Sequence, residues 1–188
     1  MLFKYPSVTV SGRITAPAEV LFAIVSDVSR HPELAGSGEV EQVEWVTPAP
    51  HGVGAGFAAR QNVGGMRYRT RSYVQVYDPP HQFVWLSGIG ARRPPFGQLW
   101  GFDFKVIDAR TTWTSNMMRV PIPLLRVPPF TWMADTGAMH EVTNMKPTLP
   151  RLAKMAGAQL LGDLRITLDW CAGDAPCSRV DPASFQTT

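Results

Sequence analysis

The alternation of apolar and polar positions predicts a chain that begins with one strand and two short helices. Residues 8–15 alternate between apolar and polar side chains, the pattern of a half-buried strand. Pro17 suits the first position of a helix, and apolar residues then recur at helical spacing up to Asp27. A second short helix is expected at residues 32–35, because Pro32 can open it.

From Glu39 onward the pattern changes from helical to extended. Short runs rich in β-branched and aromatic residues alternate with turns rich in glycine and proline, which indicates a meander of antiparallel neighbours. The six strands predicted here cover residues 40–46, 57–62, 66–78, 81–87, 98–107 and 111–120.

An apolar stripe at helical spacing predicts a long final helix over residues 130–156. Pro147 and Pro150 fall inside it, so either the helix kinks there or a loop comes first and the helix opens at Pro147. Residues 164–168 could form an extra edge strand, and residues 173–188 have the composition of a loose tail.

This order of elements predicts an α+β protein with its helices on one face of an antiparallel sheet. The expected architecture is a curved seven-stranded sheet that wraps around the long C-terminal helix, with two short helices after the first strand. We expect residues 1–157 to form the ligand-binding domain and residues 158–188 a partly irregular C-terminal extension.

Composition narrows the class of protein. With 188 residues, 45% hydrophobic and 18% charged, the chain is expected to form one globular domain. A net charge of +3 without a base-reading motif does not suggest a nucleic-acid partner. No apolar run reaches the ~18 residues that a membrane helix needs, and the N-terminus does not resemble a signal peptide, so we expect a cytoplasmic protein.

The sequence gives no sign of a metal site or a cofactor. Cys171 and Cys177 lie close to the C-terminus and are expected to be free thiols. The four histidines are scattered and show no metal-ligand spacing: His31, His51, His81 and His140.

The strand at residues 66–78 shows which of its faces is buried. Arg67, Arg69 and Arg71 alternate along one face and cannot all be buried unpaired. The other face should therefore point inward, and it carries these side chains: Met66, Tyr68, Thr70, Ser72, Val74 and Val76.

Alternation also predicts inward-facing side chains on the other strands, and the helical stripe predicts them on the last helix. The strand set is Phe57, Ala59, Gln61, Phe83, Trp85, Trp100, Phe102, Phe104, Trp113, Ser115 and Met117. The helical set is Ala138, Glu141, Met145 and Leu149, with His140 at its margin. Aromatic inner faces often form a solid core. Here many aromatic and several polar side chains share one face, which favours a small-molecule cavity.

Several segments resemble the SRPBCC superfamily, which includes START domains and birch-pollen-allergen-type proteins, and within it the polyketide cyclase/dehydrase-like branch. The matching segments are Ile14 to Phe22, Val25 to Glu33, Val43 to Trp45, Gly56 to Asn62, Pro79 to Trp85 and Thr148 to Leu152. The resemblance covers residues 8–156 and implies the helix-grip fold. Pro150, the proline-rich stretch 121–129 and the tail after Gly157 depart from the family pattern.

The resemblance implies a cyclase/aromatase-like protein that binds an aromatic or poly-β-keto molecule and promotes cyclisation and dehydration without a cofactor. We expect catalytic roles for Tyr68, Ser72 and His140. The expected substrate-binding residues are Gln61, Thr70, Phe83, Trp85, Trp100, Phe102, Trp113, Ser115, Met117, Glu141 and Met145. The family also contains non-catalytic carriers and sensors of hydrophobic ligands, and the sequence leaves this alternative open.

Two surface features suggest where a partner protein could dock and how a ligand could enter the cavity. The outward arginines 67, 69 and 71, with Arg92 and Arg93, form either a solvated face or a docking site for an acidic acyl carrier protein. The apolar, proline-rich segment 120–129 is expected to act as a stiff gate over the cavity or as a permanent plug. The chain is expected to be a monomer or a homodimer.

Overall fold

The computed structural model describes residues 4–89, 97–120 and 140–172. The proposed gate at residues 121–129, the pair Arg92 and Arg93, the side chain of Cys171, and the tail with Cys177 lie outside the described residues. The strands are β1 (Lys4–Ile14), β2 (Val40–Trp45), β3 (Gly56–Val63), β4 (Met66–Asp78), β5 (Gln82–Gly88), β6 (Gly97–Asp108), β7 (Thr111–Arg119) and β8 (Leu160–Ala172). The helices are α1 (Ala18–Ser26), the short η1 (Val28–Arg30), α2 (His31–Leu34) and α4 (Thr148–Met155).

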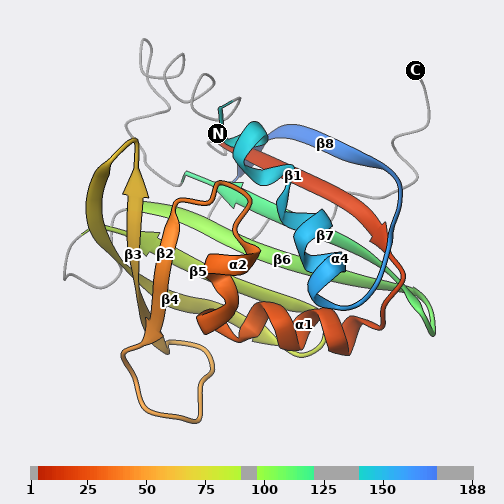
Figure 1. Cartoon of the computed structure of the whole chain (residues 1–188), viewed down its shortest axis with the longest axis horizontal. Helices are drawn as coiled ribbons and strands as arrows, with labels where there is room; N and C mark the ends of the chain where they lie inside the picture. Colours follow the sequence, from red (N-terminus) through yellow and green to blue (C-terminus); the bar gives the residue numbers. More distant parts are fainter. Residues whose placement is uncertain (1–3, 90–96, 121–139, 173–188) are drawn as a thin grey trace.

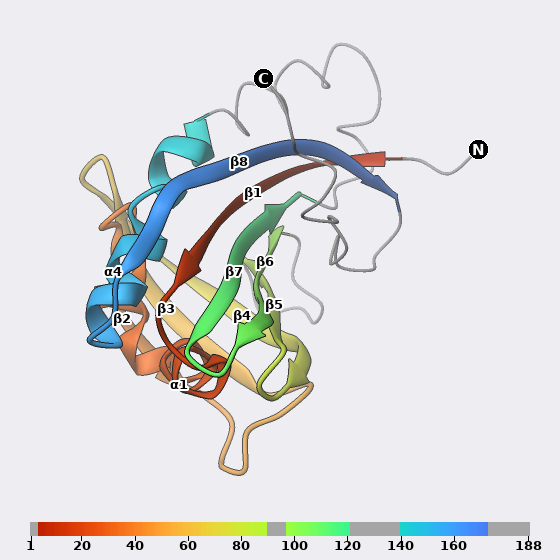
Figure 2. The same cartoon turned by 90° about the vertical axis from the view of Figure 1, so that its right-hand side faces the viewer.

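The strands form one antiparallel sheet in the order β2-β3-β4-β5-β6-β7-β1-β8. Strand pairs β1/β8, β2/β3, β4/β5 and β6/β7 contain register shifts, and such bulges bend a strand and increase its twist. The sheet curves around α1 and α4, which lie on its concave side (Figure 1, Figure 2). The predicted α+β helix-grip architecture is confirmed.

The sheet has eight strands rather than the seven predicted. The additional strand, β8, pairs with β1 along almost its whole length, from Lys4↔Ala172 to Ile14↔Leu160. The sequence pattern suggested only a short edge strand at residues 164–168, because the alternation is weak outside that stretch. Figure 2 shows β8 following the curve of β1.

The final helix predicted over residues 130–156 is interrupted next to its first proline. Residues 140–145 are helical, residues 146–147 form a turn, and α4 then begins at Thr148. Pro147 occupies the N-cap position of α4, where its missing N–H costs no helical hydrogen bond. Of the two alternatives that the prolines left open, a helix opening at Pro147 therefore describes α4. Residues 130–139 lie outside the described part of the chain.

The core lies between the concave face of the sheet and the helices. From α1, the side chains of Leu21, Phe22 and Val25 are buried against the strands. From α4, Leu149 and Leu152 are fully buried in the same cluster. None of the helices that the structure describes is both long and apolar enough to span a membrane.

Candidate functional site

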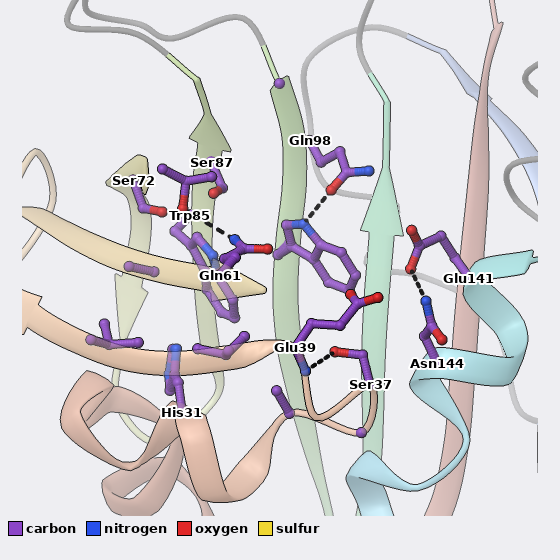
Figure 3. Close-up of a pocket in the computed structure, with 18 of the residues that line it drawn as sticks. His31, Ser37, Glu39, Gln61, Ser72, Trp85, Ser87, Gln98, Glu141 and Asn144 are labelled. Carbon is purple, nitrogen blue, oxygen red and sulfur yellow. Dashed lines mark hydrogen bonds between the residues drawn. The ribbon is translucent and has the colours of Figure 1, made fainter. Parts of the chain in front are cut away.

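A cavity of about 660 Å³ lies on the concave side of the sheet, beyond the part that α1 covers. Its floor is formed by strands β3 to β6. Its opposite wall is formed by α2, the segment that follows it, and residues 140–148 (Figure 3). A small-molecule site typically has this size and this mixture of apolar walls and a few polar groups.

Close packing between α2, its following segment and α4 holds one wall of the cavity in place. The Gly36 N–H donates to Thr148 Oγ1 at 3.1 Å, and the Arg151 guanidinium donates to the carbonyl of Ala35. A Cβ added at Gly36 would lie 2.2 Å from the Asn144 carbonyl oxygen. A side chain at position 36 would therefore push the two halves of this wall apart.

Four aromatic rings form the apolar part of the cavity: Phe57, Trp85, Trp100 and Phe102. The Trp85 and Phe102 rings are 21° from parallel, with centroids 6.4 Å apart. The Trp100 indole N–H donates to Gln98 Oε1 at 3.1 Å, which fixes the orientation of that ring. The rings give the cavity an apolar, aromatic wall.

A chain of hydrogen bonds crosses from β4 to β3 within the cavity wall. The Tyr68 hydroxyl donates to Gln61 Oε1 at 3.1 Å, and Gln61 Nε2 donates to Thr70 Oγ1 at 3.2 Å. Partial burial raises the pKa of Tyr68, and the negative charges of Glu39 and Glu141 raise it further. The phenol is therefore protonated at neutral pH and able to donate a hydrogen bond.

The carboxyl groups of Glu39 and Glu141 lie on the opposite side of the cavity from Ser72 and Ser87 (Figure 3). Burial raises the pKa of Glu141, and the neighbouring Glu39 charge raises it too. A hydrogen bond from Asn144 Nδ2, at 3.5 Å, and the charge of His140 act against that rise. Glu141 is thus a carboxyl group suited to taking up and releasing protons nearer to neutral pH than an ordinary glutamate.

His31 extends from the start of α2 into the cavity wall (Figure 3). The preceding turn is fixed by Asp27, whose Oδ1 accepts hydrogen bonds from the backbone N–H and the hydroxyl of Ser29. His31 is 7% exposed, and its Nε2 lies 2.8 Å from the carbonyl oxygen of Val25. Burial lowers the pKa of His31 against the opposing effects of the Val25 hydrogen bond and Asp27.

The structure brings ten of the predicted site residues together around this cavity. They are Gln61, Tyr68, Thr70, Ser72, Trp85, Trp100, Phe102, His140, Glu141 and Met145. The inward orientation predicted for the 68, 70 and 72 positions of β4 agrees with this placement, as does that of Phe57, Ala59 and Gln61 on β3.

The predicted inward orientation is wrong for Trp113, Ser115 and Met117 on β7. Trp113 lies under the Arg165 guanidinium at 5.8 Å, Ser115 accepts a hydrogen bond from Ser11, and Met117 packs against Val84 and Leu99. The alternate side chains of β7 face inward instead: Thr112, Thr114, Asn116 and Met118. Pairing with β6 sets this orientation, because Phe102 lies opposite Asn116 and Phe104 opposite Thr114.

Phe83 faces inward as predicted but lies in the solid core rather than on the cavity wall. It is fully buried and contacts the rings of Phe22, Tyr77 and Trp85. The inward orientation predicted for Val76 is wrong: Val76 packs against the cluster on the outer face, whereas Tyr77 packs inward. The register shift between Val74 and Val76 reverses the alternation at this point.

Sequence reasoning missed eight polar residues of the cavity: His31, Ser37, Glu39, Ser87, Gln98, Asn116, Asn144 and Thr148. Ser87 follows Trp85 by two positions on β5, so alternation could have found it. His31 and Glu39 reach the cavity from α2 and the segment after it, and no local pattern predicts where these pack. No group of three or more potential metal ligands occurs among the described residues.

No family model matches the chain. Among curated proteins, the uncharacterised proteins Rv0088 and MT0096 of two Mycobacterium tuberculosis strains are 35% and 36% identical to it over 102 residues. These matches cover 54% of this chain but only 42% of either relative, so the chain matches less than half of their length.

Several solved structures share the fold. The Zhui aromatase/cyclase from Streptomyces sp. R1128 superposes with a TM-score of 0.59 and 14% identity, covering 80% of this chain and 93% of that one. The di-domain aromatase/cyclase BexL superposes with a TM-score of 0.58 and 19% identity, covering 81% of this chain and 50% of that one. A START superfamily protein from Mycobacterium smegmatis superposes with a TM-score of 0.56 and 14% identity, covering 81% of this chain and 97% of that one. At these identities the likeness shows the predicted helix-grip fold alone, and the reaction must be argued from the site.

Proposed function

We propose that this protein is cyclase/aromatase-like: it binds an aromatic or poly-β-keto small molecule in the cavity and promotes its cyclisation and dehydration. The observation that carries the proposal is the combination of an aromatic wall with proton-donating and proton-accepting groups on one cavity of about 660 Å³. A solid core would have no use for the polar groups, and a purely apolar carrier would not need them.

The aromatic walls supply orientation. A poly-β-keto chain is flexible, and it cyclises correctly only when one methylene carbon lies close to one distant carbonyl carbon. The rings of Trp85, Trp100 and Phe102 lie on neighbouring strands on one side of the cavity and favour flat conformations of such a chain. Holding the reacting atoms in contact removes much of the entropic barrier of the step.

The polar groups supply proton transfer. In the first step, a base removes a proton from a methylene group between two carbonyls, and that carbon forms a bond to a second carbonyl carbon. The carbonyl oxygen takes up a proton and becomes a hydroxyl. In the second step, a neighbouring proton and the hydroxyl leave together as water, which leaves a ring double bond. No electrons are gained or lost, so the reaction needs no oxidant or reductant.

Glu141 suits the role of base, because its raised pKa makes the carboxylate a stronger proton acceptor than an ordinary glutamate. Tyr68 suits the role of donor to a carbonyl oxygen, because its phenol is protonated and lies on the cavity wall, where its O–H can turn from Gln61 Oε1 to a bound substrate. Ser72 and His140 line the same cavity and could donate to the departing hydroxyl. The aromatase/cyclases among the structural neighbours support this class of reaction.

The test is to incubate the protein with a short poly-β-keto thioester and to follow the product by mass spectrometry. We expect an aromatic product lighter than the substrate by one water, and a large loss of turnover in Tyr68→Phe, Ser72→Ala, His140→Ala and Glu141→Gln. Ser115→Ala serves as a control, because Ser115 lies on the outer face of the sheet. Ligand binding without any turnover would contradict the enzyme and support a carrier or sensor of a hydrophobic ligand.

A further inference from the structure

Two polar side chains at one end of the cavity are almost completely buried. His31 is 7% exposed and Ser72 is 1% exposed, and both lie on the cavity wall. In Figure 3, Ser72 and Ser87 lie beside Trp85, away from Glu141 and Asn144. Buried polar groups normally have hydrogen-bond partners, so their partners can be looked for one by one.

The hydrogen bond of His31 shows which ring nitrogen carries the proton. Nε2 lies 2.8 Å from the Val25 carbonyl oxygen, which can only accept, so Nε2 donates. Burial lowers the pKa of His31, so the imidazole is neutral at pH 7 and Nδ1 has a free lone pair. Within the described part of the chain, Nδ1 has no hydrogen-bond partner.

Ser72 is in a similar position on β4. Its register partners are Phe57 on β3 and Ser87 on β5. Its hydroxyl makes no hydrogen bond to any residue that the structure describes. The hydroxyl is therefore free to donate a hydrogen bond into the cavity.

His31 and Ser72 border the same two aromatic rings. The His31 ring lies with its centroid 5.9 Å from that of Phe57, at 89°, and 5.1 Å from that of Trp85, at 37°. Ser72 is adjacent to Phe57 across the β3/β4 ladder, and Trp85 lies two positions before Ser87 on β5. Both polar groups therefore border the part of the cavity wall that these rings form.

We propose that His31 Nδ1 forms a subsite for a phenolic or enolic hydroxyl group on a planar ring. The O–H of the ligand donates to Nδ1, and the Ser72 hydroxyl is a second, separate contact that can donate to another oxygen of a larger ligand. A methyl ether has no proton to donate to Nδ1. A carboxylate has none either, and its negative charge would lie against the Nδ1 lone pair. The inference rests on the proposed function, because phenols and enols are the products and the reactive forms of poly-β-keto compounds.

The test compares three planar probes of similar size: 2-naphthol, 2-methoxynaphthalene and naphthalene. By calorimetry, we expect wild-type protein to bind 2-naphthol about tenfold more tightly than either of the others, the effect of one net hydrogen bond. His31→Gln should abolish this preference, because the Gln amide N–H can still donate to Val25 whereas the Nδ1 acceptor is lost. Ser115→Ala should leave the preference unchanged, because Ser115 lies on the outer face of the sheet.

A second measurement needs no variant. In ¹⁵N NMR spectra of the wild-type protein, the Nδ1 signal of His31 should shift upfield when 2-naphthol binds and should stay in place with 2-methoxynaphthalene. Equal affinities for the three probes, with a stationary Nδ1 signal, would overturn the subsite and leave the aromatic cavity intact. If none of the three probes binds, both the subsite and the proposed function are overturned.

Discussion

The concave face of the sheet has two parts, both rich in aromatic side chains, and they differ in what lies against them. Under α1, Phe22 contacts the rings of Tyr77, Phe83 and Phe104, with centroids 5.5, 6.4 and 6.2 Å away. Beyond α1, the rings of Trp85, Trp100 and Phe102 face a cavity. One region is a solid core and the other is the wall of a cavity.

The difference teaches that the helices, rather than the strands, decide which part of the sheet is hollow. The strands offer similar rings to both regions. In the core region a helix supplies the ring that fills the space, whereas in the cavity region α2 and residues 140–148 supply His31, Glu141 and other polar side chains. Substitutions in the two regions should therefore affect different properties.

The largest expected effect is on stability, in the solid region. Phe22→Ala removes a 5%-exposed ring from between three others and should lower the free energy of unfolding by about 3–5 kcal/mol. Chemical denaturation measures this loss. Val20→Ala, on the exposed side of the same helix, should cost less than about 1 kcal/mol. Similar losses for the two variants would contradict a solid core here.

The next effect is on binding, in the hollow region. Trp100→Leu should lower the affinity for 2-naphthol about tenfold or more, because it removes a flat wall of the cavity. Its cost to stability should be smaller than that of Phe22→Ala, since the ring already faces open space. Trp113→Leu is the matched control on the outer face, and an equal loss of affinity there would refute the assignment of faces.

A third expected effect is on the pH dependence of stability. The folded-state pKa of His31 is lowered by burial, so below about pH 6.5 the unfolded chain binds a proton that the folded chain resists. Stability should therefore fall as the pH drops below that value. His31→Gln should flatten this part of the curve, whereas His81→Gln, at an exposed position, should not. Urea denaturation between pH 5 and pH 8 measures both; identical slopes for the two variants would exclude His31 as the cause.

The smallest effect concerns Glu141. Its raised folded-state pKa means that the folded chain holds a proton that the unfolded chain releases above pH 4.5, so stability decreases as the pH rises through this window. Glu141→Gln removes this decrease and should stabilise the protein at neutral pH by up to about 1 kcal/mol. The exposed Glu33→Gln should change little. A destabilised Glu141→Gln protein would show that the carboxylate stabilises the folded protein.

The sequence could predict the sheet and much of the cavity floor because strand alternation is a local property. Arg67, Arg69 and Arg71 cannot be buried, and this alone places Tyr68, Thr70 and Ser72 on the inner face. The same reasoning failed on β7, where the large apolar side chains Trp113 and Met117 face outward and Thr114 and Asn116 face inward. There, the register with β6 decides, and register is not visible in one strand.

The opposite wall of the cavity could not be predicted, because it depends on tertiary packing. His31 lies in a turn-rich segment whose sequence does not show that its ring will rest on Trp85. The break at Pro147 was foreseen only as one of two alternatives, and it determines how residues 140–145 approach the sheet. Sequence thus predicted the surface on which a ligand would lie better than the groups that would cover it.

The central claim is that a planar aromatic molecule binds on the concave face, against Trp85 and Trp100. The most direct test is to titrate ¹⁵N-labelled protein with 2-naphthol and to follow the assigned indole N–H signals. The account predicts that the Trp85 and Trp100 signals move and saturate together, while the Trp113 signal on the outer face stays in place. Movement of Trp113 with Trp85 and Trp100 unchanged, or no movement of any of the three, would contradict it.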